Sequence, residues 1–478
     1  MSRAGEGVSL SAAPLPRTEP APLDLGRLRR GGLTFGASQV TGMGLGFLGS
    51  LILVRVAGQA DVGLYQRLQQ AILAAGMVLQ LGLAPGALRF VPVTRGAGGG
   101  RATALLRRRL FAIQASMWML GLPALVLAWP RVVAGLDAPE LANAAPFVAA
   151  AVLLASFDLL ADAYLRAFRR YSASAVLGHL APRLLTATGF FLLWWMAPPH
   201  SLPWEALVCV YLISLLITSC GYAGALWTTT PGEVSEPREA QLPPSIPRIL
   251  STTTAMGLRS AAAVLFVASD LWILGMFRPS EEVAVYGIAA ALLQILSAIP
   301  GMAGSLLPQE FALLHADGRT AEIEALARTS ATVMAAISLV GLAGLVLLGP
   351  VLIPRLYGPG YAGAWSLLLV LAVGSFWDAA SGSAGFVLQM TGHHVWLLGL
   401  ALGGAALNIG LSVSLAPVWG GHGVALATTV TLLLMNAAMV FSVRHLLGVR
   451  TFVYLKPAEW LHALRLAGRR SGASGGAR

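Results

Sequence analysis

The stretch Asp61-Val62-Gly63-Leu64-Tyr65 decides the fold, because a second version of it returns as Val283-Ala284-Val285-Tyr286-Gly287. The first and second tyrosines lie 221 residues apart. Further landmarks repeat at almost the same spacing: Trp129-Pro130-Arg131 with Gly349-Pro350-Val351, Ser156-Phe157-Asp158 with Ser375-Phe376-Trp377-Asp378, and Arg169-Arg170-Tyr171 with Thr391-Gly392-His393. A nearly constant offset over several landmarks indicates an internal duplication.

The composition is that of an integral membrane protein. The chain of 478 residues is 56% hydrophobic and 11% charged, with a mean hydropathy of +0.73, whereas a soluble domain carries about 25% charged residues. Its apolar runs of ~20–25 residues match helices that cross a bilayer. The net charge of +11 lies in short loops and tails beside these runs, which argues against nucleic-acid binding. In a membrane chain, repeats are typical of a transporter with its site between them.

The predicted fold class is an all-α integral membrane protein with two parallel six-helix bundles. Twelve spans are expected, at residues 31–57, 63–92, 109–134, 144–167, 173–197, 204–228, 249–276, 283–310, 328–350, 361–390, 395–417 and 421–444. Because six is an even number, both halves share one orientation. The predicted segments are a disordered cytoplasmic tail (1–30), the first bundle (31–228), a cytoplasmic linker (229–248), the second bundle (249–445) and a basic tail (446–478). In the last segment, an interfacial amphipathic helix and a disordered tail are the alternatives.

Arginine placement predicts the orientation in the membrane. Both tails, the linker and three short loops carry most of the arginines, while the opposite loops offer Arg131, Arg278 and Arg355. Since cytoplasmic loops carry the excess of basic residues, both termini are expected in the cytoplasm.

Ionisable residues within spans four and five are candidate functional groups, because charge is costly in hydrocarbon. Asp158, Asp162 and Arg166 follow at intervals of four on one helix face. Span five carries His179 and Arg183 at the same interval. Asp158 and Arg183 are expected at similar depth near the midplane. They could form a structural ion pair, or belong to a titrating or substrate-binding site.

Other charged candidates lie outside these two spans. Arg259 is expected near the midplane of span seven, where a guanidinium suits phosphate; pairing with a carboxylate such as Asp378 is the alternative. Asp378 is also a candidate for binding a proton or Na⁺. Arg55 and Arg67 lie near the outer ends of spans one and two, where snorkelling to the interface is the simpler interpretation. Asp270 is a candidate partner for either.

Signatures of an enzyme are missing from the sequence. It contains no phosphate-binding glycine loop, no histidine pair at metal-ligand spacing and no nucleophile elbow. The outer loops are at most about a dozen residues long, too short for the outer domain of a membrane glycosyltransferase or polymerase.

The chain resembles the Wzx-type oligosaccharide flippases of polysaccharide biosynthesis, in the multidrug/oligosaccharidyl-lipid/polysaccharide (MOP) exporter superfamily. The resemblance covers about residues 30–445 and rests on five segments: Arg55 with 58–65, 81–90, 269–275, 356–364, and 408–428 with its Gly420-Gly421-His422-Gly423 turn. It implies a V-shaped pair of bundles, alternating access, and location in a bacterial inner membrane. It also implies a polyprenyl-pyrophosphate-linked oligosaccharide as substrate, with the polysaccharide polymerase machinery as a candidate partner.

By this resemblance, the cations facing the pyrophosphate would be Arg183 and Arg259, with Arg55 and Arg67 as further candidates. Asp158, Asp162 and Asp378 would carry a coupling proton or Na⁺, or set the charge of the cavity. No cofactor and no enzymatic activity are expected. The alternatives are a multidrug antiporter of the same superfamily, a lipid II flippase, and a scaffold that does not transport.

Overall fold

The computed structural model describes residues 25–135, 138–229, 244–297 and 307–454, apart from positions 309, 313 and 316. Side chains at some further positions, Arg259 among them, lie outside this description. So do most of the predicted tails and linker, including the candidate amphipathic helix. The described residues are nearly all helical, and their one β-type contact is an isolated bridge between Ala57 and Leu202. The predicted all-α membrane fold is confirmed.

The first half of the chain contains seven α-helices and two short irregular helices: α1 (Leu25–Val56), α2 (Gln59–Gln80), α3 (Leu83–Gly135), η1 (Pro139–Ala144), α4 (Ala145–Ala167), α5 (Tyr171–Ala175), η2 (Val176–Leu180), α6 (Ala181–Met196) and α7 (Trp204–Trp227). The second half contains α8 (Ile246–Phe277), α9 (Ser280–Leu296), α11 (Thr320–Tyr357), η3 (Pro359–Tyr361), α12 (Ala364–Ser381), α13 (Ala384–Met390) and α14 (His394–Leu447).

Within the described residues the predicted spans fall on these helices, and residues 298–306 of span eight lie outside the description. By length and composition, eight described helices could cross a membrane, or nine when α2 and the start of α3, which meet at 44°, count as one bent span. Spans eleven and twelve are the two parts of α14, which breaks at Gly420. Span five is built from α5, η2 and α6 in succession.

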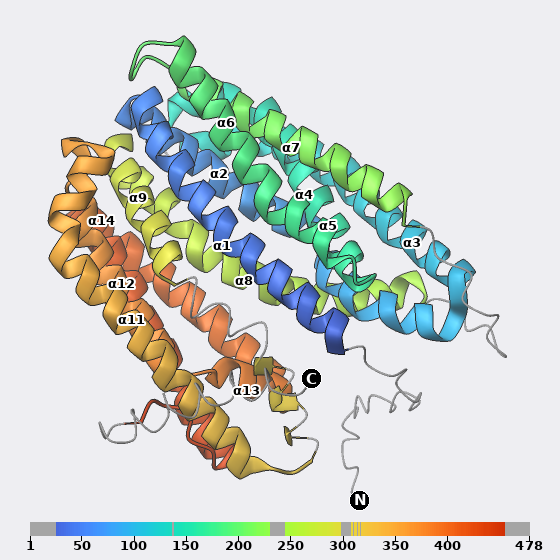
Figure 1. Ribbon diagram of the computed structural model, residues 1–478. Coiled ribbons are helices and arrows are strands. Elements are labelled where there is room, and N and C mark those ends of the chain that lie inside the picture. The colour runs from blue at the N-terminus through green and yellow to red at the C-terminus, as the bar shows by residue number, and fades with distance from the viewer. Residues whose placement is uncertain are drawn as a thin grey trace, which may run out of the picture.

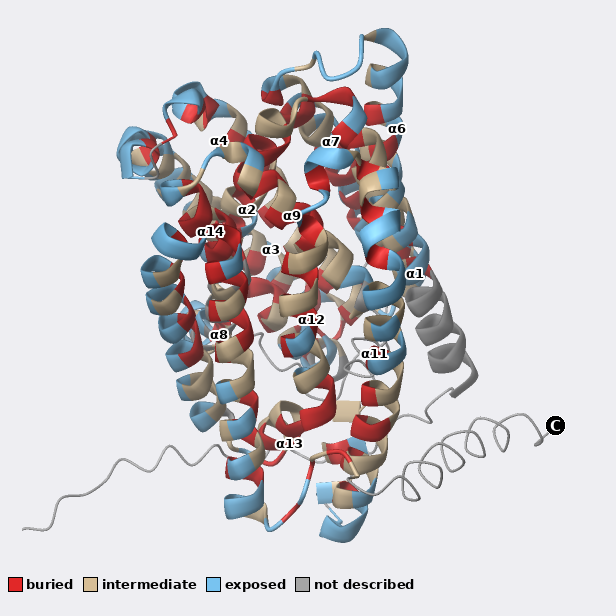
Figure 2. Cartoon of the chain, turned by 90° about the vertical axis from the view of Figure 1, so that its left-hand side faces the viewer, coloured by how far each residue is buried: buried red, intermediate tan, exposed pale blue. Residues whose placement is uncertain are grey.

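The helices expose large apolar side chains on their outward faces, as a bilayer requires. Leu120, Leu127, Trp195, Val340 and Leu347 are each more than 70% exposed. In Figure 2, buried positions gather where helices meet and exposed positions follow the helix faces that point outward. In water this surface would be unfavourable by about 25 cal/mol per Å², whereas lipid tails solvate it.

The two halves share a large hydrophobic core at one end of the molecule. One buried cluster combines Val54 and Tyr65 of the first half with Tyr286, Tyr357 and Tyr361 of the second. A second cluster joins first-half residues to Ile249 at the start of α8, whereas a third, around Phe311, Val387 and Val443, lies within the second half. In Figure 1, α11–α14 and α1–α7 lie together at the upper left and diverge toward the bottom, while α8 runs beside the first half. We call the shared region, around residues 53–65, 283–289 and 353–361, the joined end.

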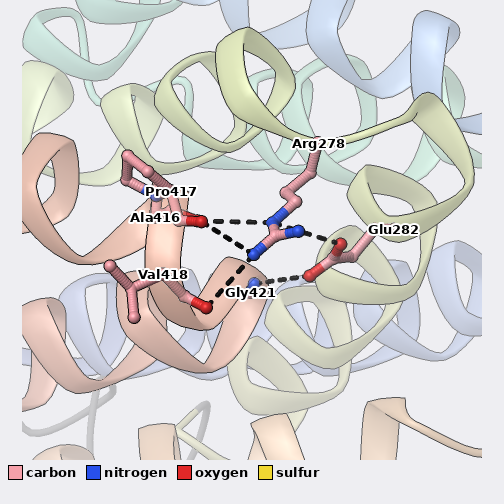
Figure 3. A network of polar contacts seen from close by, with 6 residues as sticks. All are labelled: Arg278, Glu282, Ala416, Pro417, Val418 and Gly421. Atoms are coloured by element: carbon pink, nitrogen blue, oxygen red, sulfur yellow. Dashed lines mark hydrogen bonds and ion pairs between the residues drawn. The ribbon is translucent and has the colours of Figure 1, made fainter.

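Two charged residues hold the break in α14 (Figure 3). The guanidinium of Arg278 donates to the carbonyl oxygens of Ala416, Pro417 and Val418, at 3.0–3.3 Å. These carbonyls lie at the C-terminal end of the first part of α14, where helical hydrogen bonds run out and a cation is favourable. The carboxylate of Glu282 accepts the Gly421 N–H at 2.7 Å, at the start of the second part. The negative C-terminal end of the first part of α14 therefore meets a cation, and the positive N-terminal end of the second part meets a carboxylate.

Helix packing agrees with the duplication. In the first half, α4 packs against α2, α3 and α7. In the second half, α12 packs against α9, α11 and α14. Asp158 on α4 and Asp378 on α12 therefore occupy corresponding places, as the sequence offset predicts.

Candidate functional site

Arg183 lies in a groove that glycines create on α1. An added Cβ at Gly42 would lie 2.7 Å from Nη1 of Arg183, and one at Gly46 would lie 3.6 Å from its Cδ. The guanidinium also approaches the His179 carbonyl oxygen at 3.4 Å. Among the described side chains, no carboxylate forms an ion pair with Arg183. A half-buried cation of this kind is available for an anionic ligand.

A π-helical turn precedes Arg183. The N–H of Ala181 reaches back five residues to the Val176 carbonyl. Pro182 has no N–H, so an ordinary helical hydrogen bond to Gly178 cannot form. Such π-turns occur frequently at functional sites.

Asp158 and Asp162 face α7. Asp158 accepts hydrogen bonds from Thr218 at 3.0 Å and Ser219 at 2.6 Å. Asp162 forms an ion pair with Arg166 at 2.8 Å and accepts from Ser174 and Tyr222. The described structure thus connects these carboxylates to their own half, and Asp158 does not meet Arg183. Hydroxyl groups of α7 bind Asp158, for which the sequence suggests Arg183 as a partner.

Asp378 opens into a cavity of about 450 Å³ inside the second half. The lining comes from Ser297 at the C-cap of α9 and from α11, α12, α13 and α14, and includes Ser375, Gln389, Asn436 and Phe386. Cavities of this size, with few polar groups among apolar ones, are typical ligand sites. The carboxylate is therefore placed to meet a ligand or a cation.

Arg55 and Arg67 do not line this cavity. Arg67 is 4% exposed and packs at the joined end against Gly275 of α8. Its backbone carbonyl accepts a hydrogen bond from the indole of Trp272 at 3.2 Å. Arg55 is exposed and lines a second cavity at the joined end. Arg259 lies on α8, but its side chain is outside the described residues.

Asp270 forms a buried polar cluster that sequence reasoning missed. The side chain is 5% exposed and accepts hydrogen bonds from Tyr286 at 2.7 Å, Thr428 at 2.8 Å and Asn408 at 2.9 Å. The sequence suggests Arg55 or Arg67 as its partner, whereas the described donors are the neutral side chains of Tyr286, Asn408 and Thr428 on α9 and α14. In the sequence, Asp270, Asn408 and Thr428 are polar residues within apolar spans, but their positions do not predict that they contact one another.

The described residues contain no group of three or more histidine, cysteine, aspartate or glutamate side chains that could hold a metal ion. Among the described carboxylates of the spans, Asp158 is held by hydroxyls, Asp270 by hydroxyls and an amide, and Asp162 by hydroxyls and an arginine. Such an arrangement can bind and move charged ligands.

Solved structures share this fold. A multidrug resistance MATE family transporter of the MOP superfamily, in an inward-facing conformation, matches with a TM-score of 0.67 and 15% identity, covering 85% of this chain and 94% of its own. Lipid II flippase MurJ, in an inward closed conformation, gives 0.67 and 12%, covering 90% of each chain. A MOP superfamily transporter from Pyrococcus furiosus, whose binding pocket is described as having reversed polarity, gives 0.64 and 16%, covering 90% and 99%. At these identities the likeness shows the fold alone.

The sequence itself identifies the family. No curated protein matches it. A family model described as polysaccharide biosynthesis protein matches residues 28–309, which is more than half of the chain. With the fold of MOP superfamily transporters already established, this chain belongs to the polysaccharide biosynthesis protein family.

Proposed function

We propose that this protein is a flippase that moves a polyprenyl-pyrophosphate-linked oligosaccharide from the cytoplasmic to the outer leaflet of a bacterial inner membrane. The observation that carries the proposal is the family match over residues 28–309. A core shared by both halves at one end, with a separate core inside the second half, supports alternating access, because α11 to α14 can then move relative to the first half. The protein then acts as a transporter and not as an enzyme.

In this function Arg183 and Arg259 hold the pyrophosphate. Arg183 supports this role because the glycines of α1 give its guanidinium room and no described carboxylate neutralises it. A planar guanidinium binds two phosphate oxygens at once. The lipid tail remains in the bilayer between the two halves.

We further propose Asp378 as the carboxylate that carries a coupling proton or Na⁺. It opens into a cavity, whereas Asp158 and Asp162 are engaged by hydroxyls and by Arg166. Asp158 and Asp162 would set the charge of the first half. Coupling through Asp378 predicts that Asp378→Asn slows transport without changing the amount of protein in the membrane.

The experiment that tests the function is deletion of the gene in its native host. We expect loss of surface polysaccharide, with complete repeat units accumulating on lipid at the cytoplasmic face. The wild-type gene and Arg131→Gln, which changes an exposed arginine outside both described cavities, should restore the polymer. Arg183→Gln should not. Restoration by Arg183→Gln at equal protein amount would refute the phosphate role of Arg183.

A multidrug antiporter is the second candidate function. It is favoured by the MATE-like fold and by Asp378 and Phe386, which line the same cavity, because carboxylates and aromatic rings attract organic cations. The same deletion separates the candidates. Unchanged polysaccharide with new sensitivity to cationic dyes would favour the antiporter, and a defect in cell-wall synthesis would favour a lipid II flippase.

A further inference from the structure

A second cavity, of about 500 Å³, lies at the joined end and is lined by both halves of the molecule. The first half contributes Arg55 and His200, and the second contributes Arg355 and Tyr361. Among the described residues that line it, three are basic and none is acidic. The cavity is therefore electropositive.

Backbone contacts fix the basic groups of this cavity. Arg55 lies in the last turn of α1 and Arg355 in the last turn of α11. His200 has a φ of 56°. Its N–H donates to the Arg55 carbonyl at 3.1 Å, and its ring nitrogen Nδ1 lies 3.3 Å from the Ala57 oxygen. Gln59 then connects the two halves beside the cavity, by donating to the Gly360 carbonyl at 3.0 Å.

The charges in the cavity lack counterions within the described structure. Neither Arg55 nor Arg355 has a described hydrogen-bond or ion-pair partner for its exposed side chain. Tyr361 is 5% exposed, and its buried hydroxyl has no described partner either. Two like charges that line one cavity repel each other. An anion between them would remove this repulsion.

We propose that this cavity is a phosphate-group site that joins the two halves, separate from the pyrophosphate site assigned to Arg183 and Arg259. Arg55 and Arg355 hold the phosphate oxygens from opposite halves, and the Tyr361 hydroxyl is a further donor. Guanidinium groups suit this ligand because their N–H groups match two phosphate oxygens. Bound phosphate stabilises contact between the halves, because separating them removes one of the two arginines. The inference does not depend on which lipid is transported.

The test is a titration of the purified full-length protein in detergent with inorganic pyrophosphate, followed by calorimetry at low salt. We expect saturable binding with one component that is at least tenfold weaker in Arg55→Gln and in Arg355→Gln, while pyrophosphate bound by Arg183 and Arg259 is unaffected by either change. Arg131→Gln, at an exposed arginine outside both described cavities, is the matched control and should bind like wild type. If all four proteins bind pyrophosphate with equal affinity, the cavity does not bind a soluble phosphate anion.

A second arm identifies a lipid source of the phosphate. The same four proteins are placed in nanodiscs of phosphatidylcholine, with or without phosphatidylglycerol, and retained lipid is measured by native mass spectrometry. Retention of phosphatidylglycerol that is lost in both glutamine variants, without pyrophosphate binding, assigns a lipid headgroup. If neither probe distinguishes the two variants from Arg131→Gln, the site does not exist.

Folding is controlled separately. Circular dichroism and thermal unfolding accompany each titration, and exposed side chains such as these should leave the unfolding temperature unchanged. Should a glutamine variant unfold, Arg355→Lys replaces it. Lysine keeps the charge but not the fork geometry, so binding intermediate between wild type and Arg55→Gln is expected, and full wild-type affinity would contradict the two-oxygen contact.

Discussion

Gly63 allows α2 and α9 to approach closely at the joined end, and we expect Gly63→Ala to favour opening there. An added Cβ would overlap the carbonyl oxygen of Ser280 and lie 2.8 Å from its carbonyl carbon, whereas carbon atoms in good contact are about 3.5–4.0 Å apart. Backbone atoms cannot rotate away, so the two helices must separate by about 1 Å. Overpacking of this kind costs about 1–3 kcal/mol. The closed arrangement loses that free energy relative to an open one.

A cysteine at position 50 measures the opening. The Ser50 hydroxyl lies 2.8 Å from the Tyr357 hydroxyl across the two halves, so Ser50→Cys is shielded while they are joined. In a background with Cys209→Ser and Cys220→Ser, its rate of reaction with a membrane-impermeant maleimide reports the open population. A cost of 1–3 kcal/mol raises that population roughly 5- to 150-fold. We expect an increase in labelling rate within this range.

The control is Gly76→Ala, the same substitution in the same helix. An added Cβ at Gly76 meets no atom within 4 Å, so the labelling rate should remain at the wild-type value. If Gly63→Ala also labels at the wild-type rate while its circular dichroism is unchanged, the joined end is not a gate held by close backbone packing.

Three further substitutions test the packing of the second half by thermal unfolding in detergent. Asp270→Ala removes the acceptor of three hydrogen bonds and leaves the Tyr286 hydroxyl without a described one, while Asn408 and Thr428 keep other acceptors, so it should cost about 1–3 kcal/mol. Asp270→Asn keeps an acceptor and should restore most of the loss; equal unfolding temperatures for the two would contradict the hydrogen-bonded cluster. Arg278→Gln exposes the carbonyls at the α14 break and should cost about 1–3 kcal/mol, and an unchanged unfolding temperature would show that water replaces the guanidinium. Gly382→Ala should lower the unfolding temperature more than Gly392→Ala, because both have positive φ but only the first would meet the backbone of Thr451.

Apolar runs were sufficient to predict the helices. The break between spans eleven and twelve was expected after residue 417, and α14 breaks at Gly420. Helical periodicity also predicted correctly that Asp158 and Asp162 share a face. Burial of that face follows from the same pattern, because a charged stripe on an apolar helix must turn away from lipid.

Periodicity does not say which neighbouring helix a polar face meets. Asp158 and Arg183 were matched by depth along antiparallel spans, yet Asp158 turns to α7. Asp270 bonds to Asn408 and Thr428, 138 and 158 residues further along the chain. Such contacts depend on how helices rotate and cross, which is set by packing of the whole bundle.

The joined end combines close packing with incomplete hydrogen bonding, which suits a surface that must separate. Glycines bring backbones together there, since Gly63 meets Ser280 and Gly287 meets the side chain of Gln66. The buried Oε1 atoms of Gln66 and Gln70 nevertheless have no described partner. Each unsatisfied group costs about 1–3 kcal/mol while buried, and water would satisfy it on opening. This cost partly offsets the free energy gained by packing the apolar core. A ligand that binds the open state only modestly more tightly than the joined state can therefore shift the equilibrium between them.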